Sequence, residues 1–268
     1  IAAENNNNLY NITKILEDNG VFTYTSSSDA CMIASDKSLT YEEIGNAVMQ
    51  PRTFRFKIDS KGYWKRAIVN LHEKWQAEDP LTPLKLIIKP LIGVDCEDIV
   101  IIEDIDDLSY DLEEIFPPGS RIIVQEYIEG VDVSVSLICN NGKATPISLN
   151  KQFVELKNNK GNYIGGMLPF ECEYKKEAFE VAKKACEAIE GMNGFVGVDL
   201  LINENDIYPV YLLEVNSRFT TPYVGLKKIA NFNIAKTIIE GNIEDADISL
   251  DGEVEFTKQG DNLIVRRS

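Results

Sequence analysis

Two apolar stretches close to residue 200 constrain the fold more than any other feature of the chain. Residues 195–202 and 207–215 are rich in β-branched and aliphatic side chains, and only a few polar residues separate them. This pattern predicts a β-hairpin. Side chains two positions apart lie on the same face of an extended strand, so Glu214, Asn216 and Arg218 point the same way if the second strand continues that far.

The polar end of this hairpin has the chemistry of a metal and phosphate site. Glu214 and Asn216 supply oxygen atoms, and Asp199 on the neighbouring strand joins them only in a register that the sequence does not define. Two carboxylates and an amide oxygen suit Mg²⁺ or Mn²⁺, and an adjacent guanidinium such as that of Arg218 can stabilise a transferring phosphoryl group. The alternative is a solvated edge strand whose polar residues happen to alternate.

Three upstream segments fit the same chemistry. Lys89 ends the apolar strand expected at 84–89, where its ammonium group can lie over a phosphate, although ordinary strand ends also carry lysines. Lys37, in a Ser-Asp-Lys motif, can contact phosphate as well. Between Gln125 and Asp132 a strand breaks and then resumes with an acidic residue, which suits an adenine and ribose site because backbone groups are exposed at the break. A plain strand–turn–strand linker is the alternative for this segment.

Periodicity and turn residues predict an α+β architecture of strand hairpins covered by a few helices. The segment 131–137 alternates strictly, with valine and leucine on one face and Asp132, Ser134 and Ser136 on the other, so the polar face looks into solvent or a cleft. Thr40 is the expected N-cap of the second helix. The further elements expected are helices at 8–19, 41–49, 63–76, 175–189 and 225–239, and strands at 53–58, 99–102, 121–126 and 144–149.

Composition narrows the class of partner. The chain has 43 acidic and 27 basic residues and a net charge of −16, so its surface repels phosphate backbones and anionic membranes, and neither nucleic acid nor a membrane is an expected partner. No apolar run approaches the roughly 20 residues of a membrane helix, and no secretion signal is visible. Five scattered cysteines without C-x-x-C spacing indicate reduced thiols and a cytoplasmic location. The single histidine, His72, is expected to be structural, so catalysis should not depend on histidine.

The order of the motifs resembles that of the ATP-grasp superfamily. Between Ser35 and Arg218 the chain carries, in order, S-D-K, I-I-K-P, Q-E-Y-I-E-G-V-D, G-F-V-G-V-D and L-L-E-V-N-S-R. The resemblance implies an α+β ATP-grasp fold in which two α+β lobes sandwich ATP, with ATP and two Mg²⁺ or Mn²⁺ ions as cofactors. The implied roles are phosphate binding by Lys37 and Lys89, adenine contacts by Gln125, Glu126 and Ile128, ribose binding by Asp132, metal binding by Asp199, Glu214 and Asn216, and stabilisation of an acyl phosphate by Arg218.

The same resemblance divides the chain into parts. Residues 1–34 correspond to the end of a preATP-grasp subdomain and residues 35–268 to the ATP-grasp domain, with a nucleotide lobe at about 48–128 and a metal-binding, C-terminal lobe at about 129–240. One segment departs from the family. The loop that covers phosphate is commonly rich in glycine and serine, whereas residues 93–98 hold one glycine and three acidic residues. Fewer glycines make a backbone phosphate cradle harder to form.

A second signature narrows the resemblance. Residues 218–226, R-F-T-T-P-Y-V-G-L, are similar to a signature of the archaeal tyramine–L-glutamate ligase group of methanofuran biosynthesis, and S-S-S-D-A at 26–30 fits the same group. This resemblance implies an ATP-dependent carboxylate–amine ligase that joins the side-chain carboxyl of glutamate to tyramine through an acyl phosphate. Lys151 and the flexible loop expected at 162–166 are candidate substrate elements, and Lys151 is the one given a catalytic role. For Thr220 and its neighbour, a helix N-cap is the alternative.

Three other functions stay open at this point. An ATP-grasp ligase for another acid and another amine would share every feature of the ATP site. A non-catalytic ATP-binding module that regulates a partner would bind nucleotide and metal, although the presence of both Glu214 and Arg218 argues against it. An acidic structural protein with a coincidental order of motifs is the third. Both acid and amine substrates are small molecules, and a homodimeric assembly is kept open.

Overall fold

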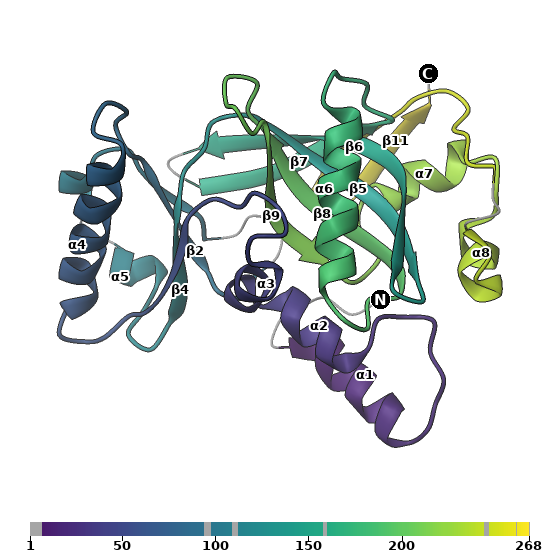
Figure 1. Ribbon diagram of the computed structural model, residues 1–268, viewed down its shortest axis with the longest axis horizontal. Coiled ribbons are helices and arrows are strands. Elements are labelled where there is room, and N and C mark those ends of the chain that lie inside the picture. Colours follow the sequence, from purple (N-terminus) through teal and green to yellow (C-terminus); the bar gives the residue numbers. More distant parts are fainter. Residues whose placement is uncertain are drawn as a thin grey trace.

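Two antiparallel sheets organise the chain (Figure 1). The computed structural model describes residues 7–93, 98–108, 112–157, 160–243, 247–260 and 262–267. The smaller sheet has the strand order β1-β4-β2-β3, and the larger one has the order β11-β10-β7-β6-β5-β8-β9. Helices lie against both sheets, so the expected α+β architecture is confirmed.

The small sheet packs on helix α4. This helix buries Trp64, Ile68 and Trp75. These side chains share one apolar cluster with the buried faces of the strands, where Leu86 and Ile122 are fully enclosed. Removing this apolar surface from water holds the helix on the sheet. The elements of this part are β1 (Thr53–Lys57), α4 (Tyr63–Glu78), β2 (Leu86–Pro90), β3 (Val100–Ile102), the 3-10 helix η2 (Ile105–Asp107), α5 (Leu112–Ile115) and β4 (Arg121–Glu126).

Helix α6 covers one face of the large sheet (Figure 1). Its buried residues are mostly alanines spaced three or four positions apart, so the helix can approach the strands closely. On β5, Val133 and Val135 face this core, whereas Ser134 lies on the opposite, cavity side of the sheet. The elements are β5 (Val131–Asn140), β6 (Lys143–Lys157), β7 (Lys160–Leu168), α6 (Lys175–Ala188), β8 (Gly194–Ile202), β9 (Val210–Asn216), β10 (Val254–Gln259) and β11 (Asn262–Arg267).

Short helices lie near the two ends of the chain. Near the N-terminus, the Glu17 carboxylate accepts a hydrogen bond of 2.8 Å from the backbone N–H of Ser28 and so ties the first two helices together. Near the C-terminus, two helices pack on a third apolar cluster that includes Val254 and Phe256 of β10. These helices are α1 (Asn8–Asp18), α2 (Ser28–Ser35), α3 (Lys37–Ile44), α7 (Tyr223–Ile229) and α8 (Ile234–Glu240).

The predicted start of helix α3 is wrong. The helix begins at Lys37 and not at Tyr41, because the carboxylate of Asp36 caps it by accepting a hydrogen bond of 2.9 Å from the backbone N–H of Ser38. Thr40 therefore lies inside the helix, and its hydroxyl donates to a backbone carbonyl at 2.7 Å. Asp36, four residues before the predicted cap Thr40, therefore caps the helix.

The helix predicted over 225–239 is two helices. Helix α7 ends at Ile229, and α8 begins after Asn233, whose side-chain oxygen accepts a hydrogen bond of 3.0 Å from the first turn. Between them the backbone N–H of Asn231 donates to the carbonyl of Ser249 at 3.1 Å. Apolar spacing continues across the break, so the pattern alone does not reveal that this segment pairs with a distant part of the chain.

The large sheet extends further than predicted. The flexible loop expected at 162–166 is wrong, because these residues lie in β7. Lys151 lies within β6, which continues past the predicted end at residue 149. Strands β10 and β11 were not predicted. Most of the glycine-poor 93–98 segment lies outside the described residues.

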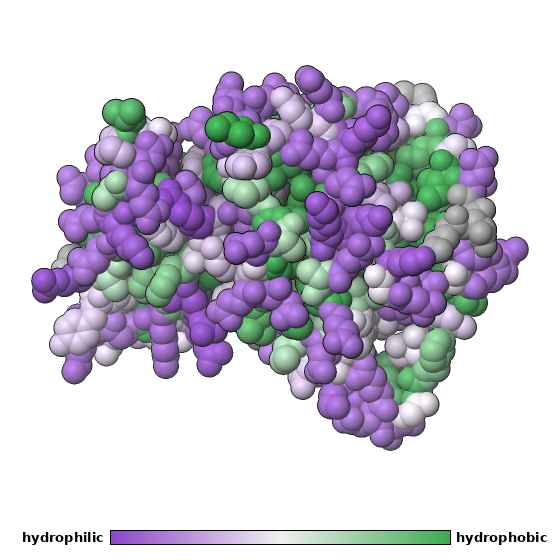
Figure 2. All heavy atoms as spheres, in the orientation of Figure 1, coloured by the Kyte–Doolittle hydropathy of each residue, from purple (hydrophilic) through white to green (hydrophobic). Residues whose placement is uncertain are grey.

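Figure 2 shows a face covered mostly by hydrophilic side chains. In the part of the chain that is described, no helix has both the length and the apolar character needed to cross a membrane. His72 contacts the carbonyl oxygen of Leu84 through Nε2 at 3.0 Å, which is a structural role. The described cysteines, Cys31, Cys139, Cys172 and Cys186, are free thiols.

Candidate active site

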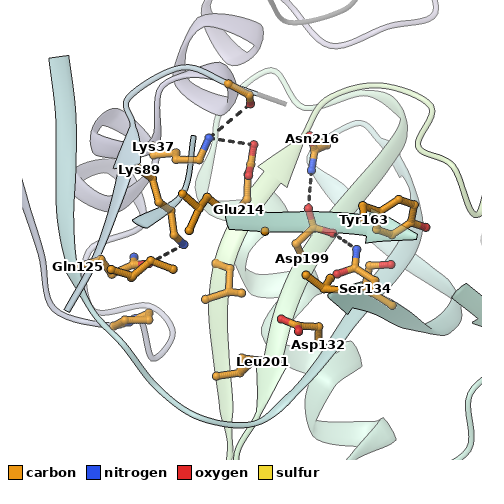
Figure 3. Close-up of a pocket in the computed structure, with 18 of the residues that line it drawn as sticks. Lys37, Lys89, Gln125, Asp132, Ser134, Tyr163, Asp199, Leu201, Glu214 and Asn216 are labelled. Atoms are coloured by element: carbon orange, nitrogen blue, oxygen red, sulfur yellow. Dashed lines mark hydrogen bonds and ion pairs between the residues drawn. The ribbon is translucent and has the colours of Figure 1, made fainter. Parts of the chain in front are cut away.

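A cavity of about 270 Å³ lies between the two sheets (Figure 3). Side chains of β2, β3 and β4 line one side, and side chains of β5 to β9 line the other. The fold therefore brings segments that are far apart in sequence to one place. Of the predicted site residues, all but Lys151 line this cavity: Lys37, Lys89, Gln125, Glu126, Ile128, Asp132, Asp199, Glu214, Asn216 and Arg218.

The register of β8 and β9, which the sequence does not define, brings Asp199 next to Glu214 and Asn216. Asp199 stands opposite Glu214, and Gly197 stands opposite Asn216. Asn216 Nδ2 donates a hydrogen bond to Asp199 Oδ2 at 2.9 Å (Figure 3). Arg218 Nη2 donates to Asn216 Oδ1 at 3.1 Å. Two carboxylates, an amide and a guanidinium thus form one cluster in the cavity wall.

Gly197 allows the segment after β9 to pack on the sheet. A Cβ atom at this position would lie 2.5 Å from Thr220 Cγ2, so the methyl group of Thr220 fills the space that a side chain would need. The contact holds the segment that carries Arg218. Thr220 and Thr221 line the cavity, and α7 has no side-chain N-cap bond, so the N-cap alternative for them is wrong.

The carboxylate pair favours a bound cation. Burial and the adjacent Glu214 carboxylate raise the pKa of Asp199 to about 7, since burial and a second negative charge both disfavour the ionised form. Within the described residues, no group of three or more His, Cys, Asp and Glu side chains could hold a metal ion. Two carboxylates and the Asn216 amide instead fit an ion such as Mg²⁺, which takes few protein ligands and completes its shell with phosphate oxygens and water.

Two lysine side chains line the cavity. Lys37 Nζ, from α3, lies 3.5 Å from Glu214 Oε1 and 3.5 Å from the carbonyl oxygen of Gly93 (Figure 3). Lys89 Nζ, from β2, donates to Gln125 Oε1 at 3.0 Å. These lysines concentrate positive charge in an otherwise acidic protein, and that charge suits an anionic ligand such as a phosphate chain.

Another part of the lining is apolar and surrounds the break between β4 and β5. There the carboxylate of Glu126 is already engaged, because Arg52 binds it with two hydrogen bonds of 2.9 and 2.8 Å. Any contact from Glu126 to a ligand would therefore come from its backbone. Asp132 lies just beyond the break, where burial raises its pKa and the Lys89 ammonium partly offsets that effect. The apolar lining residues include Ile87, Ile99, Ile101, Ile128, Leu201 and Leu213.

Lys151 is not brought into the cavity. Its ammonium group lies 5.4 Å from the centroid of the Phe170 ring. Side chains alternate along β6, so Gln152 lines the cavity in its place. The catalytic role of Lys151 stays a prediction. Gln152 was not predicted, and its signal was the alternation that continues beyond residue 149. Tyr163, from the segment 162–166 that was expected to contact the substrate, also lines the cavity, but from strand β7 and not from a loop.

The sequence profile of the ATP-grasp domain matches residues 34–222. The chain belongs to the ATP-grasp family. Tyramine–L-glutamate ligase from Methanocaldococcus fervens is 31% identical to this ATP-grasp chain over 258 residues, which are 96% of the chain and 69% of that enzyme. The ligase of the same name from Methanocaldococcus jannaschii is 31% identical over 254 residues, which are 94% of the chain and 65% of that enzyme.

Solved structures share the ATP-grasp fold. An ATP-grasp superfamily protein from Archaeoglobus fulgidus superposes with a TM-score of 0.68 at 26% identity, over 100% of this chain and 75% of that one. Biotin carboxylase from Campylobacter jejuni superposes with a TM-score of 0.71 at 18% identity, over 93% of this chain and 56% of that one. The expectations of an ATP-grasp fold and of an ATP-dependent carboxylate–amine ligase are confirmed.

Proposed function

We propose that this ATP-grasp chain joins the side-chain carboxyl group of glutamate to the amine of tyramine, while ATP is converted to ADP and phosphate. The observation that carries the proposal is the cluster of Asp199, Glu214, Asn216 and Arg218 in a cavity that two lysines also face. The choice of glutamate and tyramine is supported by the two related ligases of that name and by the R-F-T-T-P-Y-V-G-L segment that begins at Arg218.

ATP would bind in the cavity between the two sheets. Lys37 and Lys89 would bind its phosphates, and the apolar lining near Ile128, with Gln125 and the backbone of Glu126, would receive adenine. The carboxylate of Asp132 would accept hydrogen bonds from the ribose hydroxyls. In keeping with this proposal, the polar and apolar parts of the lining match the polar and apolar parts of a nucleotide.

Asp199, Glu214 and Asn216 would hold two divalent ions, Mg²⁺ or Mn²⁺. When bound, such ions neutralise charge on the phosphate oxygens. This assignment is supported by the amide of Asn216, which orients one Asp199 oxygen through a hydrogen bond of 2.9 Å. Arg218, bonded to Asn216, adds a fixed positive charge beside the same cluster.

The reaction would proceed in two steps. An oxygen of the glutamate side-chain carboxylate attacks the γ-phosphorus of ATP, and ADP leaves, which gives an acyl phosphate. The neutral amine of tyramine then attacks the acyl carbon, phosphate leaves with the bridging oxygen, and the nitrogen loses a proton to give the amide. Arg218 would stabilise the negative charge of the acyl phosphate. Positioning and charge stabilisation suffice for this chemistry, which suits a cavity without a histidine in its lining.

The direct test is to incubate the protein with ATP, Mg²⁺, glutamate and tyramine and to measure ADP and the amide product, the latter by mass spectrometry. We expect ADP release to require both substrates and the amide to accumulate in equal amount. Glu214→Gln should lose most of this activity, whereas Glu253→Gln, at an exposed position, should keep it. Full activity in a folded Glu214→Gln variant would contradict the metal assignment. Amide formation with a different acid or amine in a substrate panel would contradict the substrate assignment alone.

A further inference from the structure

Gln152 reaches Asp199 across an intervening strand. Its Nε2 donates a hydrogen bond of 2.8 Å to Asp199 Oδ1. Gln152 belongs to β6 and Asp199 belongs to β8, and β5 lies between these two strands in the sheet. Neighbouring strands are about 4.8 Å apart, so the two backbones are separated by roughly 10 Å at this point. Two side chains of moderate length are needed to close that gap.

The strand in between leaves room for this contact. Ser134 of β5 stands opposite Asp199 on one side and opposite Asn150 on the other. The Ser134 hydroxyl oxygen accepts a hydrogen bond of 3.2 Å from Asn150 Nδ2, which keeps the side chain close to the sheet. A small side chain at this place lets the glutamine lie over the sheet. Asparagine at position 152 would be one methylene shorter, about 1.5 Å, and its amide would not reach Asp199.

Gln152 and Asn216 together fix the plane of the Asp199 carboxylate. Gln152 binds Oδ1 at 2.8 Å, and Asn216 binds Oδ2 at 2.9 Å. Each carboxylate oxygen has two lone pairs, so each oxygen keeps one for a cation. Both donors are neutral amides. They orient the carboxylate without cancelling its charge, as a lysine or arginine in the same place would do.

We propose that Gln152 is a positioning residue for the divalent cation at Asp199, and that its neutral, long side chain is what this task requires. The inference rests on the proposed function, since the cation is the one that accompanies ATP. Hydrogen-bond partners of metal ligands commonly contribute about 10-fold to 100-fold in metal affinity or activity. Gln152 would act through Asp199 and would not itself contact the reacting atoms.

Three variants separate this role from simple packing. Gln152→Met keeps the length but removes the donor, and Gln152→Asn keeps the amide but shortens the reach. Both of these changes should weaken the binding of Mn²⁺, added without nucleotide and measured by electron paramagnetic resonance, by about 10-fold. Gln152→Lys keeps a donor of similar reach, yet its ammonium would pair with Asp199 and take the place of the cation, so Mn²⁺ binding should be lost. Thermal unfolding without metal should stay close to that of the wild type for Gln152→Met and Gln152→Asn.

Kinetics give a second readout. In Gln152→Met and Gln152→Asn, the metal concentration for half-maximal ADP release should rise about 10-fold. At saturating metal, kcat of these two variants should be close to that of the wild type. Glu155→Gln, an exposed change on the same strand, is the control and should bind Mn²⁺ as the wild type does. Equal Mn²⁺ affinity in wild type, Gln152→Met and Gln152→Asn would overturn the inference, and so would absence of Mn²⁺ binding by the wild type. A protein that binds Mn²⁺ with this dependence on Gln152 but forms no amide would contradict only the proposed function.

Discussion

Asp199 and Glu214 are paired in register on adjacent strands, so both carboxylates face the same cavity. Burial and the Glu214 charge raise the pKa of Asp199 to about 7. A divalent ion must therefore displace a proton from Asp199 below that pH. We expect the affinity for Mn²⁺ to fall by about tenfold for each pH unit below about 7, and to change little above it. Titrations at about pH 6 and about pH 8 check this, and equal affinity at both values would exclude the linkage.

The raised pKa of Asp199 should also make the unfolding free energy depend on pH. The folded protein binds the Asp199 proton more tightly than the unfolded chain does, so this contribution to stability is complete below the ordinary pKa of about 4 and is lost as the pH rises through about 7. Asp199→Asn should remove this contribution from the pH dependence of the unfolding free energy. Urea denaturation of both proteins between about pH 4 and about pH 8 measures it. Identical pH profiles would show that Asp199 does not titrate in this range.

Lys37 should contribute to nucleotide binding. Its ammonium lies 3.5 Å from Glu214 Oε1 and is oriented into the cavity. Replacing it with methionine removes one charge-assisted contact, which corresponds to about 1.5 kcal/mol and a rise of about 10-fold in the Michaelis constant for ATP. Lys57→Met, at an exposed position on β1, is the matched control. An unchanged constant for ATP in Lys37→Met would remove Lys37 from the phosphate site.

Gly197 should tolerate no side chain without a loss of activity. A Cβ atom there would lie 2.5 Å from Thr220 Cγ2, so Gly197→Ala must displace the segment that carries Arg218. We expect the unfolding free energy to fall by about 1–3 kcal/mol and kcat to fall more than the Michaelis constant for ATP rises. Adding Thr220→Gly to this variant should restore part of the activity. Wild-type kcat in Gly197→Ala would show that the position of this segment does not control the reaction.

Local patterns predicted much of the fold. The strict alternation of 131–137 and the helical spacing of 175–189 each appear where expected, because one face of each element is buried in the core. The start of α3 was not predicted correctly, because Asp36 and Thr40 are both plausible caps and only the tertiary environment selects between them. Strands β10 and β11 were missed. Strand β10 pairs with β7, which is distant in sequence, and β11 joins the sheet only through β10.

Chemistry at the site was predictable from residue types, but its geometry was not. The spacing of Glu214 and Asn216 correctly predicted that both side chains face the cavity from β9, whereas Arg218 lies beyond the end of the strand at Asn216 and reaches the cavity from the following turn. The register that adds Asp199 is a property of the assembled sheet. Gln152 could not be found in the same way, since it reaches Asp199 from two strands away. Long-range pairing therefore determines the part of the site that the local sequence leaves undefined.

Transfer of oxygen from acid to phosphate tests the central claim most directly. With glutamate labelled by ¹⁸O in its side-chain carboxyl group, attack of that carboxylate on ATP makes one labelled oxygen the bridge of the acyl phosphate. When the amine displaces phosphate, this oxygen leaves with it. We predict one ¹⁸O atom in each phosphate released with wild-type protein, ATP, Mg²⁺ and tyramine, as read by ³¹P NMR or mass spectrometry. Phosphate released without ¹⁸O, while ADP forms at the normal rate, would contradict an acyl-phosphate ligase.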